Sequence, residues 1–223
     1  MIELATMSYR AGVIGLGFIG FDSPDSHVRA YEDCADTILI ATSDINPVKA
    51  FGYTRPIVMK EENLDIVSVC TPVETHCQIV CDIAPFVKAI YCEKPIATTL
   101  EEADRMIETC HKHGVILQVN HQRRFTKPKM RWSRGILNNG THAFDLMRQM
   151  FGDGWQAKID LEYVDSMDYP PIFELVINQP ELRPILKGVE HLVECLKEGK
   201  QSISSGEEAR ETLKEVLQFE GTR

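Results

Sequence analysis

The chain has 223 residues, of which 43% are hydrophobic and 26% are charged, and its formal net charge at pH 7 is −9. This composition is typical of a soluble globular protein with one large domain and a smaller appendage. The acidic balance argues against nucleic acid as a main partner, because phosphate binding requires a basic stripe. The first ten residues are too polar for a signal peptide and no apolar run approaches the length of a membrane span, so we expect no membrane association.

The seven cysteines are scattered without paired spacing. Most lie in apolar segments, where a free cysteine behaves as a small buried hydrophobe, and this usage predicts a reducing cytoplasm. Cys77 and Cys81 are four residues apart and follow His76, which is the spacing of half a metal site. Because no second ligand pair follows at a suitable spacing, we expect no bound metal.

A glycine-rich segment follows the first apolar run. Residues 10–20 read RAGVIGLGFIG, in which Gly15, Gly17 and Gly20 have the G-x-G-x-x-G spacing. Between a strand and a helix, the first glycine allows a tight turn, the second lets the backbone approach a pyrophosphate, and the third permits close helix packing. The segment therefore predicts a dinucleotide-binding loop.

The loop also contains Phe18 and Ile19, which are expected to contact the cofactor. The residues after Gly20 read FDSPDSH, so the turn is longer than in the tightest dinucleotide loops. We expect the following helix to begin after Ser23, with Pro24 at its first position.

A second apolar run, residues 37–44, ends in Asp44. An acid ~20 residues beyond the glycines can accept hydrogen bonds from both adenosine ribose hydroxyls and would repel a 2′-phosphate, which favours NAD over NADP. The alternative is a solvated strand end or a cap for the next helix.

Apolar runs and amphipathic segments alternate over the next part of the chain. Strands are predicted at 64–72, 89–93 and 115–121, and helices at 73–87 and 99–114, the second with Thr99 and Glu102 as a capping box and Gly114 as its stop. This alternation predicts an α/β fold with a doubly wound parallel sheet. Ligands of such sheets bind at the carboxyl ends of the strands. The further cofactor contacts expected there are Thr71, Pro72, His76, Glu93, Lys94 and Asn120.

One protein family shares these motifs in the same order. The segments that carry the resemblance are GVIGLGFIG, DIVSVCTPVETH, YCEKPIATTLEEADRMI, VNHQRRF and NNGTHAFDLMRQMFG. They resemble the glucose–fructose oxidoreductase, inositol dehydrogenase and rhizopine-catabolism group, Gfo/Idh/MocA. The resemblance covers residues 10–152 and 185–219. The glycine loop is generic, whereas the E-K-P turn and the later G-x-H-x-x-D segment are much more specific.

The resemblance implies two domains. Residues 1–121 would form an N-terminal Rossmann domain with a doubly wound parallel sheet. Residues 122–223 would form a second, reduced α+β domain of mostly antiparallel sheet, which carries the substrate wall and the oligomer interface. The last helices, 185–219, would pack back on the Rossmann domain. The implied protein is a cytoplasmic homo-oligomer, a dimer or a tetramer, and it is short for the family in its second domain.

The resemblance also places Lys94 and His142 in the active site of a pyridine-nucleotide oxidoreductase that acts on a sugar, cyclitol or nucleotide sugar. Oxidation of a secondary alcohol requires a hydride acceptor, a base for the hydroxyl proton and a positive group near the developing alkoxide. The nicotinamide is the first of these. A histidine suits the second, and a lysine ammonium suits the third. We therefore predict His142 as the proton acceptor and Lys94 as the active-site cation. The alternatives are a helix N-terminus that happens to contain a histidine, for His142, and a surface lysine before a proline turn, for Lys94.

Three other polar residues are predicted to bind the substrate. Asn138 stands where several family members carry aspartate; an asparagine can still hydrogen-bond a substrate hydroxyl. Asp145 is expected to orient His142 or to contact the substrate, and capping its own helix is the alternative. Arg124 is expected to bind the substrate or the cofactor phosphates, and a basic loop paired with acidic neighbours is the alternative.

Some choices stay open at this level. The Lys94–Pro95 bond can be cis or trans. The same fold could serve a reductase of a non-sugar substrate, or a non-catalytic NAD-binding sensor or scaffold, because the second domain looks depleted.

Overall fold

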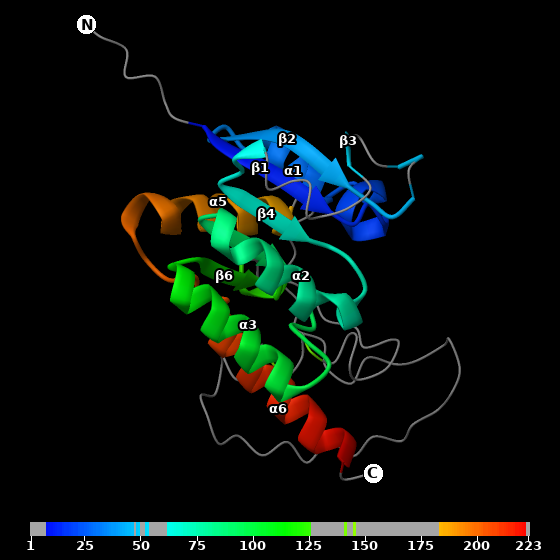
Figure 1. The fold of residues 1–223 in the computed structure, drawn as a ribbon, viewed down its shortest axis with the longest axis vertical. Helices are drawn as coiled ribbons and strands as arrows, with labels where there is room; N and C mark the ends of the chain where they lie inside the picture. The colour runs from blue at the N-terminus through cyan, green and yellow to red at the C-terminus, as the bar shows by residue number, and fades with distance from the viewer. Residues whose placement is uncertain are drawn as a thin grey trace, which may run out of the picture.

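The computed structural model describes residues 8–46, 48–49, 52–53, 62–125, 141, 145 and 183–221. Within them, six strands form one sheet in the order β3-β2-β1-β4-β5-β6, and every pairing is parallel (Figure 1). This is the strand order of the doubly wound dinucleotide-binding fold, in which the chain reverses direction across the sheet beside β1. The predicted parallel sheet is confirmed.

The strands are shorter than predicted at their carboxyl ends. Their bounds are Tyr9–Ile14 (β1), Thr37–Ser43 (β2), Gly52–Tyr53 (β3), Ile66–Val69 (β4), Ala89–Cys92 (β5) and Ile116–Val119 (β6). As a result, Asp44, Glu93 and Asn120 lie just beyond the strands and not in them. Strand β3 was not predicted, because two residues carry no periodic pattern.

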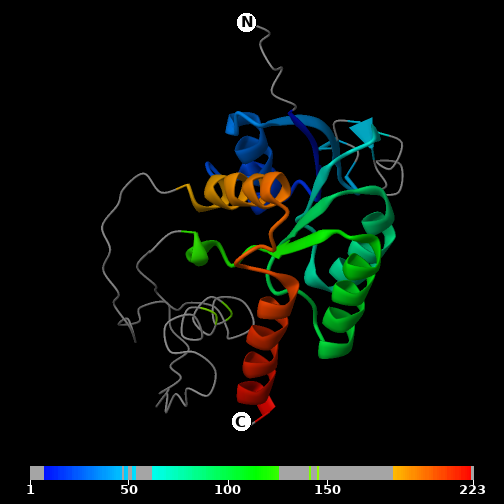
Figure 2. The same cartoon turned by 90° about the vertical axis from the view of Figure 1, so that its left-hand side faces the viewer.

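Helices cover both faces of the sheet. They are His27–Asp33 (α1), His76–Ile83 (α2), Leu100–His113 (α3), Pro184–Glu198 (α5) and Gly206–Gly221 (α6). Figure 2 shows α1 and α5 on one face and α2 and α3 on the other, with α6 beside α3. None of the helices in the described part of the chain has the length and apolar character needed to cross a membrane.

The predicted caps of α3 are confirmed. The Thr99 side chain accepts a hydrogen bond from the backbone N–H of Glu102, with a distance of 3.2 Å, and Gly114 ends the helix in the left-handed region at φ 67°.

The predicted start of the first helix is wrong. A π-helical turn, Phe18–Asp22 (η1), begins directly after Gly17 and contains Gly20, and α1 begins only at His27. Pro24 disfavours a helical conformation at the residue before it, which explains why η1 ends at Ser23. Ser23 is accordingly extended and ends η1. Ser26 then caps α1 by accepting from the N–H of Arg29 at 3.3 Å.

Two apolar layers hold the helices to the sheet. One lies under α2, α3 and α6 and includes Val69, Val80, Met106 and Leu213; the other lies under α1 and α5 and includes Val13, Tyr31, Tyr91 and Leu192. Helix α5 approaches β5 closely at Gly188, where a Cβ atom would lie 2.0 Å from the Tyr91 hydroxyl oxygen.

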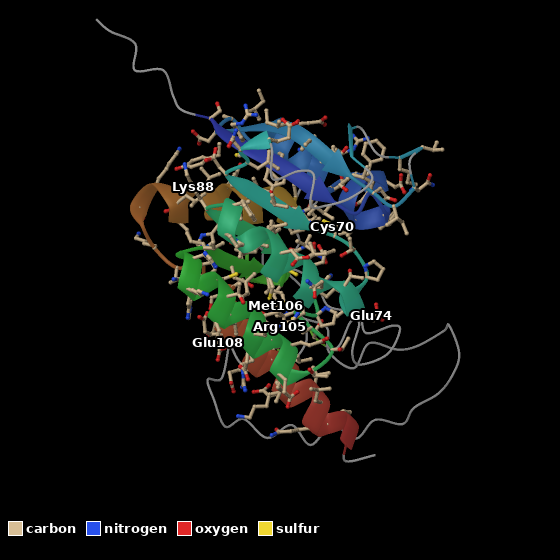
Figure 3. The ribbon with its side chains drawn as sticks, in the orientation of Figure 1. Cys70, Glu74, Lys88, Arg105, Met106 and Glu108 are labelled. Atoms are coloured by element: carbon tan, nitrogen blue, oxygen red, sulfur yellow. The ribbon has the colours of Figure 1, made fainter. Side chains whose placement is uncertain are left out.

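The two ends of the sheet are well separated. Figure 3 shows Lys88, just before β5, and Cys70, just after β4, at opposite ends of the sheet, with Met106 on the helix that covers its front. The predicted boundary after residue 121 stays a prediction, because most of residues 126–182 lie outside the described part of the chain.

Candidate active site

The glycine loop lies at the carboxyl end of β1, beside the end of β4. Gly15 has a φ of +91°, and a Cβ there would lie 2.7 Å from the carbonyl carbon of Cys70. A Cβ at Gly20 would lie 2.0 Å from the carbonyl oxygen of Gly15, so the third glycine packs closely despite the lengthened turn. A Cβ at Gly17 would meet nothing within 4 Å. The first and third glycines therefore shape the loop, while the second leaves open space in which a pyrophosphate fits.

The turn η1 begins immediately at this open space. The first amides of a helical turn, here those of Phe18, Ile19 and Gly20, have no acceptor within the turn and favour an anion. Lys49 holds the loop from outside, because its Nζ donates to the carbonyl oxygen of Leu16 at 3.1 Å and to Asp22 at 3.3 Å. The loop therefore fits the phosphates of a dinucleotide.

Asp44 is tied to the same loop. One carboxylate oxygen accepts from the backbone N–H of Leu16 and the other from that of Asn46, both at 2.7 Å. Each oxygen keeps a second lone pair, so this geometry is compatible with the predicted ribose contact. It also places the negative charge of Asp44 beside the loop.

His76 joins two of the loops at this edge. Its Nε2 lies 2.9 Å from the carbonyl oxygen of Thr71, and its Nδ1 lies 3.1 Å from that of Pro95. The ring is 1% exposed. The loop that contains Thr71 and the exposed Pro72 is thus connected to the Lys94–Pro95 turn, whose peptide bond is cis.

Lys94 is half-buried at the carboxyl end of β5. Glu93, immediately before it, is 7% exposed and accepts from His27 at 3.0 Å and from Asn120 at 2.5 Å. Glu93 and Asn120 thus point their polar atoms at other protein groups, and their predicted cofactor contacts stay predictions. His27 was missed in the sequence, because its main partner is 66 residues away.

Arg124 and Asp145 bind each other. Arg124 Nε lies 2.7 Å from both carboxylate oxygens of Asp145, and its Nη2 also contacts Asp145 and lies 3.0 Å from Glu208. Thr212 donates to Asp145 at 3.3 Å. The side chain of Asp145 is 1% exposed. This is the pairing with acidic neighbours that the sequence left open for Arg124, and the predicted substrate contacts of both residues stay predictions.

His121 is a second residue that the sequence analysis missed. It follows Asn120 directly, it is 1% exposed, and its Nδ1 lies 3.4 Å from Asp145. Burial lowers its pKa below the ordinary 6.5; the charge of Asp145 opposes this shift, while those of Arg124 and Lys94 reinforce it. Its position at the end of a predicted strand is the feature of the sequence that could have identified it.

This shift predicts how stability depends on pH. Because the folded pKa of His121 is below its unfolded value, its contribution is fully present above pH 6.5 and is lost as the pH falls from there toward the folded pKa. We expect the free energy of unfolding, measured with urea at pH 7.5, 6.5 and 5.5, to fall by at most ~1.4 kcal/mol per pH unit for this group. His121→Asn should flatten this dependence, whereas the exposed His113→Asn should not; equal slopes for all three proteins would contradict the assignment.

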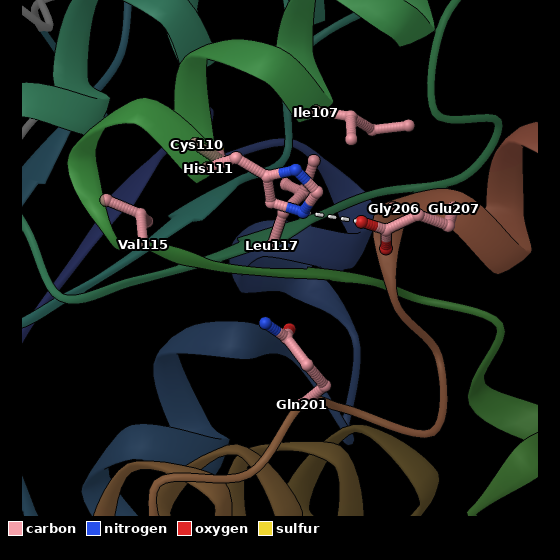
Figure 4. Close-up of a pocket in the computed structure, with 8 residues that line it drawn as sticks. All are labelled: Ile107, Cys110, His111, Val115, Leu117, Gln201, Gly206 and Glu207. Atoms are coloured by element: carbon pink, nitrogen blue, oxygen red, sulfur yellow. Dashed lines mark ion pairs between the residues drawn. The ribbon is translucent and has the colours of Figure 1, made fainter.

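The remaining two predicted site residues, Asn138 and His142, lie outside the described residues, although the neighbouring Thr141 is buried. A narrow crevice lies elsewhere, at the amino end of β6 (Figure 4). It is bordered by Val115 and Leu117 and by an ion pair between His111 and Glu207 at 2.7 Å. It is therefore separate from the edge that carries Lys94.

Much of the chain is similar in sequence to known oxidoreductases. Residues 9–121 match the model of an oxidoreductase family with an NAD-binding Rossmann fold. Myo-inositol 2-dehydrogenase of Thermotoga maritima is 33% identical over 144 residues, which are 59% of this chain and 41% of that protein. D-xylose 1-dehydrogenase [NADP(+)] of Haloarcula marismortui is 37% identical over 142 residues, 59% of this chain and 39% of that protein. The aligned part of the chain thus spans about two fifths of these relatives.

A solved structure shares the fold over almost the whole chain. It is an oxidoreductase from Agrobacterium radiobacter in complex with NAD+, L-tartaric acid and magnesium, with a TM-score of 0.72 and 15% identity; the match covers 94% of each chain.

Proposed function

The chain belongs to the Gfo/Idh/MocA family of oxidoreductases, and on this premise we propose that it is an NAD-dependent dehydrogenase of a sugar, cyclitol or nucleotide sugar. The observation that carries the proposal is one sheet edge that combines the open glycine loop, the Asp44 carboxylate and Lys94. The names of the relatives support a polyol or sugar hydroxyl as the reacting group. A homo-oligomer in the cytoplasm is part of the same proposal.

The cofactor would be held by this chain's own groups along the edge. The loop from Gly15 to Gly20 would hold the pyrophosphate, Asp44 the adenosine ribose, and the backbone around Thr71 and Pro72 would border the rest. When bound, the nicotinamide supplies the acceptor or donor of hydride.

Lys94 would act on the substrate oxygen. Its ammonium would donate a hydrogen bond to the hydroxyl and stabilise the negative charge that develops there as the proton leaves. His142 would accept that proton, with Asn138 as a hydrogen-bonding group for a neighbouring hydroxyl. In the direction of reduction, the same groups would return the proton to the carbonyl oxygen.

A substrate screen tests the activity. The protein is incubated with NAD and a panel of inositols, aldoses and nucleotide sugars, and formation of the reduced cofactor is followed by absorbance. We expect turnover with a member of this panel. The reverse reaction is tested with NADH and carbonyl compounds, including non-sugar ones. If the protein binds NADH but turns over none of these compounds in either direction, a sensor or scaffold would be favoured instead.

The choice between NAD and NADP is tested at Asp44. We expect the wild-type protein to bind NADH more tightly than NADPH, because the carboxylate favours ribose hydroxyls and repels a phosphate. Asp44→Asn should weaken NADH binding and reduce the ratio of the Kd for NADPH to the Kd for NADH by roughly tenfold, about 1.4 kcal/mol. Fluorescence titration with both cofactors measures this. Asp65→Asn, an acid at the opposite end of the sheet that pairs with Lys88, is the matched control, and equal wild-type affinities would contradict the role of Asp44.

A further inference from the structure

A chain of buried hydrogen bonds lies beneath the Lys94 turn. His27 lies between Ser68 and Glu93, with 2.8 Å from Nδ1 to the serine oxygen and 3.0 Å from Nε2 to the carboxylate. Tyr31 lies 2.8 Å from Ser68. The serine, the histidine and the tyrosine are all 0% exposed. The chain therefore connects α1, β4 and the end of β5 away from solvent.

A second branch reaches Glu93 from β6. The Asn120 side-chain amide donates to Oε1 of Glu93 at 2.5 Å, and the Tyr91 hydroxyl donates to the Asn120 side-chain oxygen at 2.7 Å. Tyr91 packs edge-on against the His27 ring, with centroids 4.8 Å apart. Because Gly188 of α5 leaves room for the Tyr91 hydroxyl, this branch is fixed by packing as well as by hydrogen bonds.

The chemistry of the partners sets the direction of these bonds. A carboxylate only accepts, so Nε2 of His27 carries a proton and donates to Glu93. The Tyr31 hydroxyl can donate to Ser68, and Ser68 can then donate to Nδ1. In this arrangement every buried hydrogen has an acceptor, which is the condition for holding polar groups out of water at low cost.

As a result, both carboxylate oxygens of Glu93 have hydrogen-bond donors within the protein. Oε1 of Glu93 accepts from His27 and Asn120, and Oε2 faces the backbone N–H of Lys94 at 3.3 Å. Burial alone would raise the pKa of Glu93, but the hydrogen bonds from His27 and Asn120 and the charge of Lys94 outweigh it and lower the pKa below its ordinary value. From the other side of the turn, His76 holds the carbonyl oxygen of Pro95.

We propose that His27 is a positioning residue for Lys94: by donating to Glu93, it fixes the carboxylate that holds the Lys94 backbone and provides a negative charge beside the lysine. The inference rests on the proposed function, in which Lys94 is the active-site cation. It also assigns Glu93 and Asn120 a supporting role under the turn, where the sequence predicted direct cofactor contacts.

Two substitutions at His27 separate positioning from packing. His27→Gln keeps an N–H near the position of Nε2, whereas His27→Leu keeps similar bulk and removes the donor. Val80→Ala on α2, in the apolar layer on the other face of the sheet, is the control for a general loss of stability.

The first measurement needs neither cofactor nor substrate. In protein labelled with [15N]lysine, the backbone amide of Lys94 is assigned by its absence in Lys94→Arg. We expect this resonance to move in His27→Leu, to stay near its wild-type position in His27→Gln, and to be unchanged in Val80→Ala. An unmoved resonance in His27→Leu would overturn the proposal. If His27→Leu does not fold, the same resonance is measured in Ser68→Ala, which removes the donor to Nδ1 of His27. The resonance should move in this variant too, and an unmoved resonance would overturn the proposal.

The second measurement uses the loaded enzyme. We expect kcat to fall roughly 10- to 100-fold in His27→Leu and to recover largely in His27→Gln, with the Kd for NADH nearly unchanged. A weakened Kd with an intact kcat would overturn positioning and favour direct cofactor contacts of Glu93 and Asn120. If the wild-type protein turns over no substrate, the proposed function fails, while the amide resonance still tests the role of His27.

Discussion

Lys94→Met is expected to lower kcat by about 10²- to 10³-fold and to leave NADH binding nearly intact. Removal of one preorganised donor to a developing oxyanion costs about this much, and methionine keeps the length and the apolar stem of lysine without its charge. Lys94 is half-buried and follows the buried Glu93, so its ammonium would need less reorganisation in the proposed reaction than a fully exposed one. Steady-state kinetics on a substrate identified by the screen, with NADH titration alongside, measure both quantities.

Lys88→Met is the matched control for this change. Lys88 lies at the other end of the same strand, its side chain is 62% exposed, and its ammonium pairs with Asp65. Its replacement should leave kcat unchanged. Lys94→Arg keeps the charge but presents it in a planar group of different reach, so partial activity is expected. Full activity of Lys94→Met would remove Lys94 from the mechanism and leave only a structural role for the turn.

The sheet could be predicted from the sequence because its central strands β4 and β5 are buried on both faces. Residues 66–69 of β4 are all buried, and such a strand appears in the sequence as a continuous apolar run. Local chemistry also predicted α3, whose capping threonine and terminal glycine act within one turn of the helix ends. The two-residue strand β3 has no comparable signal, because its pairing depends on β2 and not on its own residues.

The site residues divide in the same way. Position at a strand end is a property of the chain, so Glu93, Lys94 and Asn120 could be selected from the sequence. The contacts of a side chain depend on the tertiary structure and could not be predicted in the same way. Glu93 and Asn120 bind each other because β5 and β6 are neighbours in the sheet. His27 escaped notice for the same reason, since its role arises from contacts with β4 and β5. The start of α1 was misplaced because Ser26, and not Ser23, caps the helix.

Arg124→Leu is expected to destabilise the protein by about 3–5 kcal/mol, because it leaves the buried carboxylate of Asp145 without its main counter-charge. Thr212 and His121 are the other described neighbours of that carboxylate, at 3.3 and 3.4 Å, and neither replaces a bidentate guanidinium. For a chain of this size the loss corresponds to a fall in Tm of roughly 10 °C. Urea unfolding followed by far-UV circular dichroism measures it, with the exposed Arg29→Leu on α1 as the matched control.

A double-mutant cycle decides what this ion pair does. If Arg124 and Asp145 act mainly on each other, Asp145→Asn should recover part of the stability lost in Arg124→Leu, because the buried charge is removed together with its partner. If they instead bind substrate as the sequence predicted, Arg124→Lys should raise KM while the free energy of unfolding changes little.

The first outcome is expected, since Arg124 also contacts the carbonyl oxygen of Ile203 and the carboxylate of Glu208. These contacts join the end of β6, position 145 and the start of α6, so the pair would hold Asp145 against the Rossmann sheet. Strictly additive effects of the two substitutions would contradict this coupling.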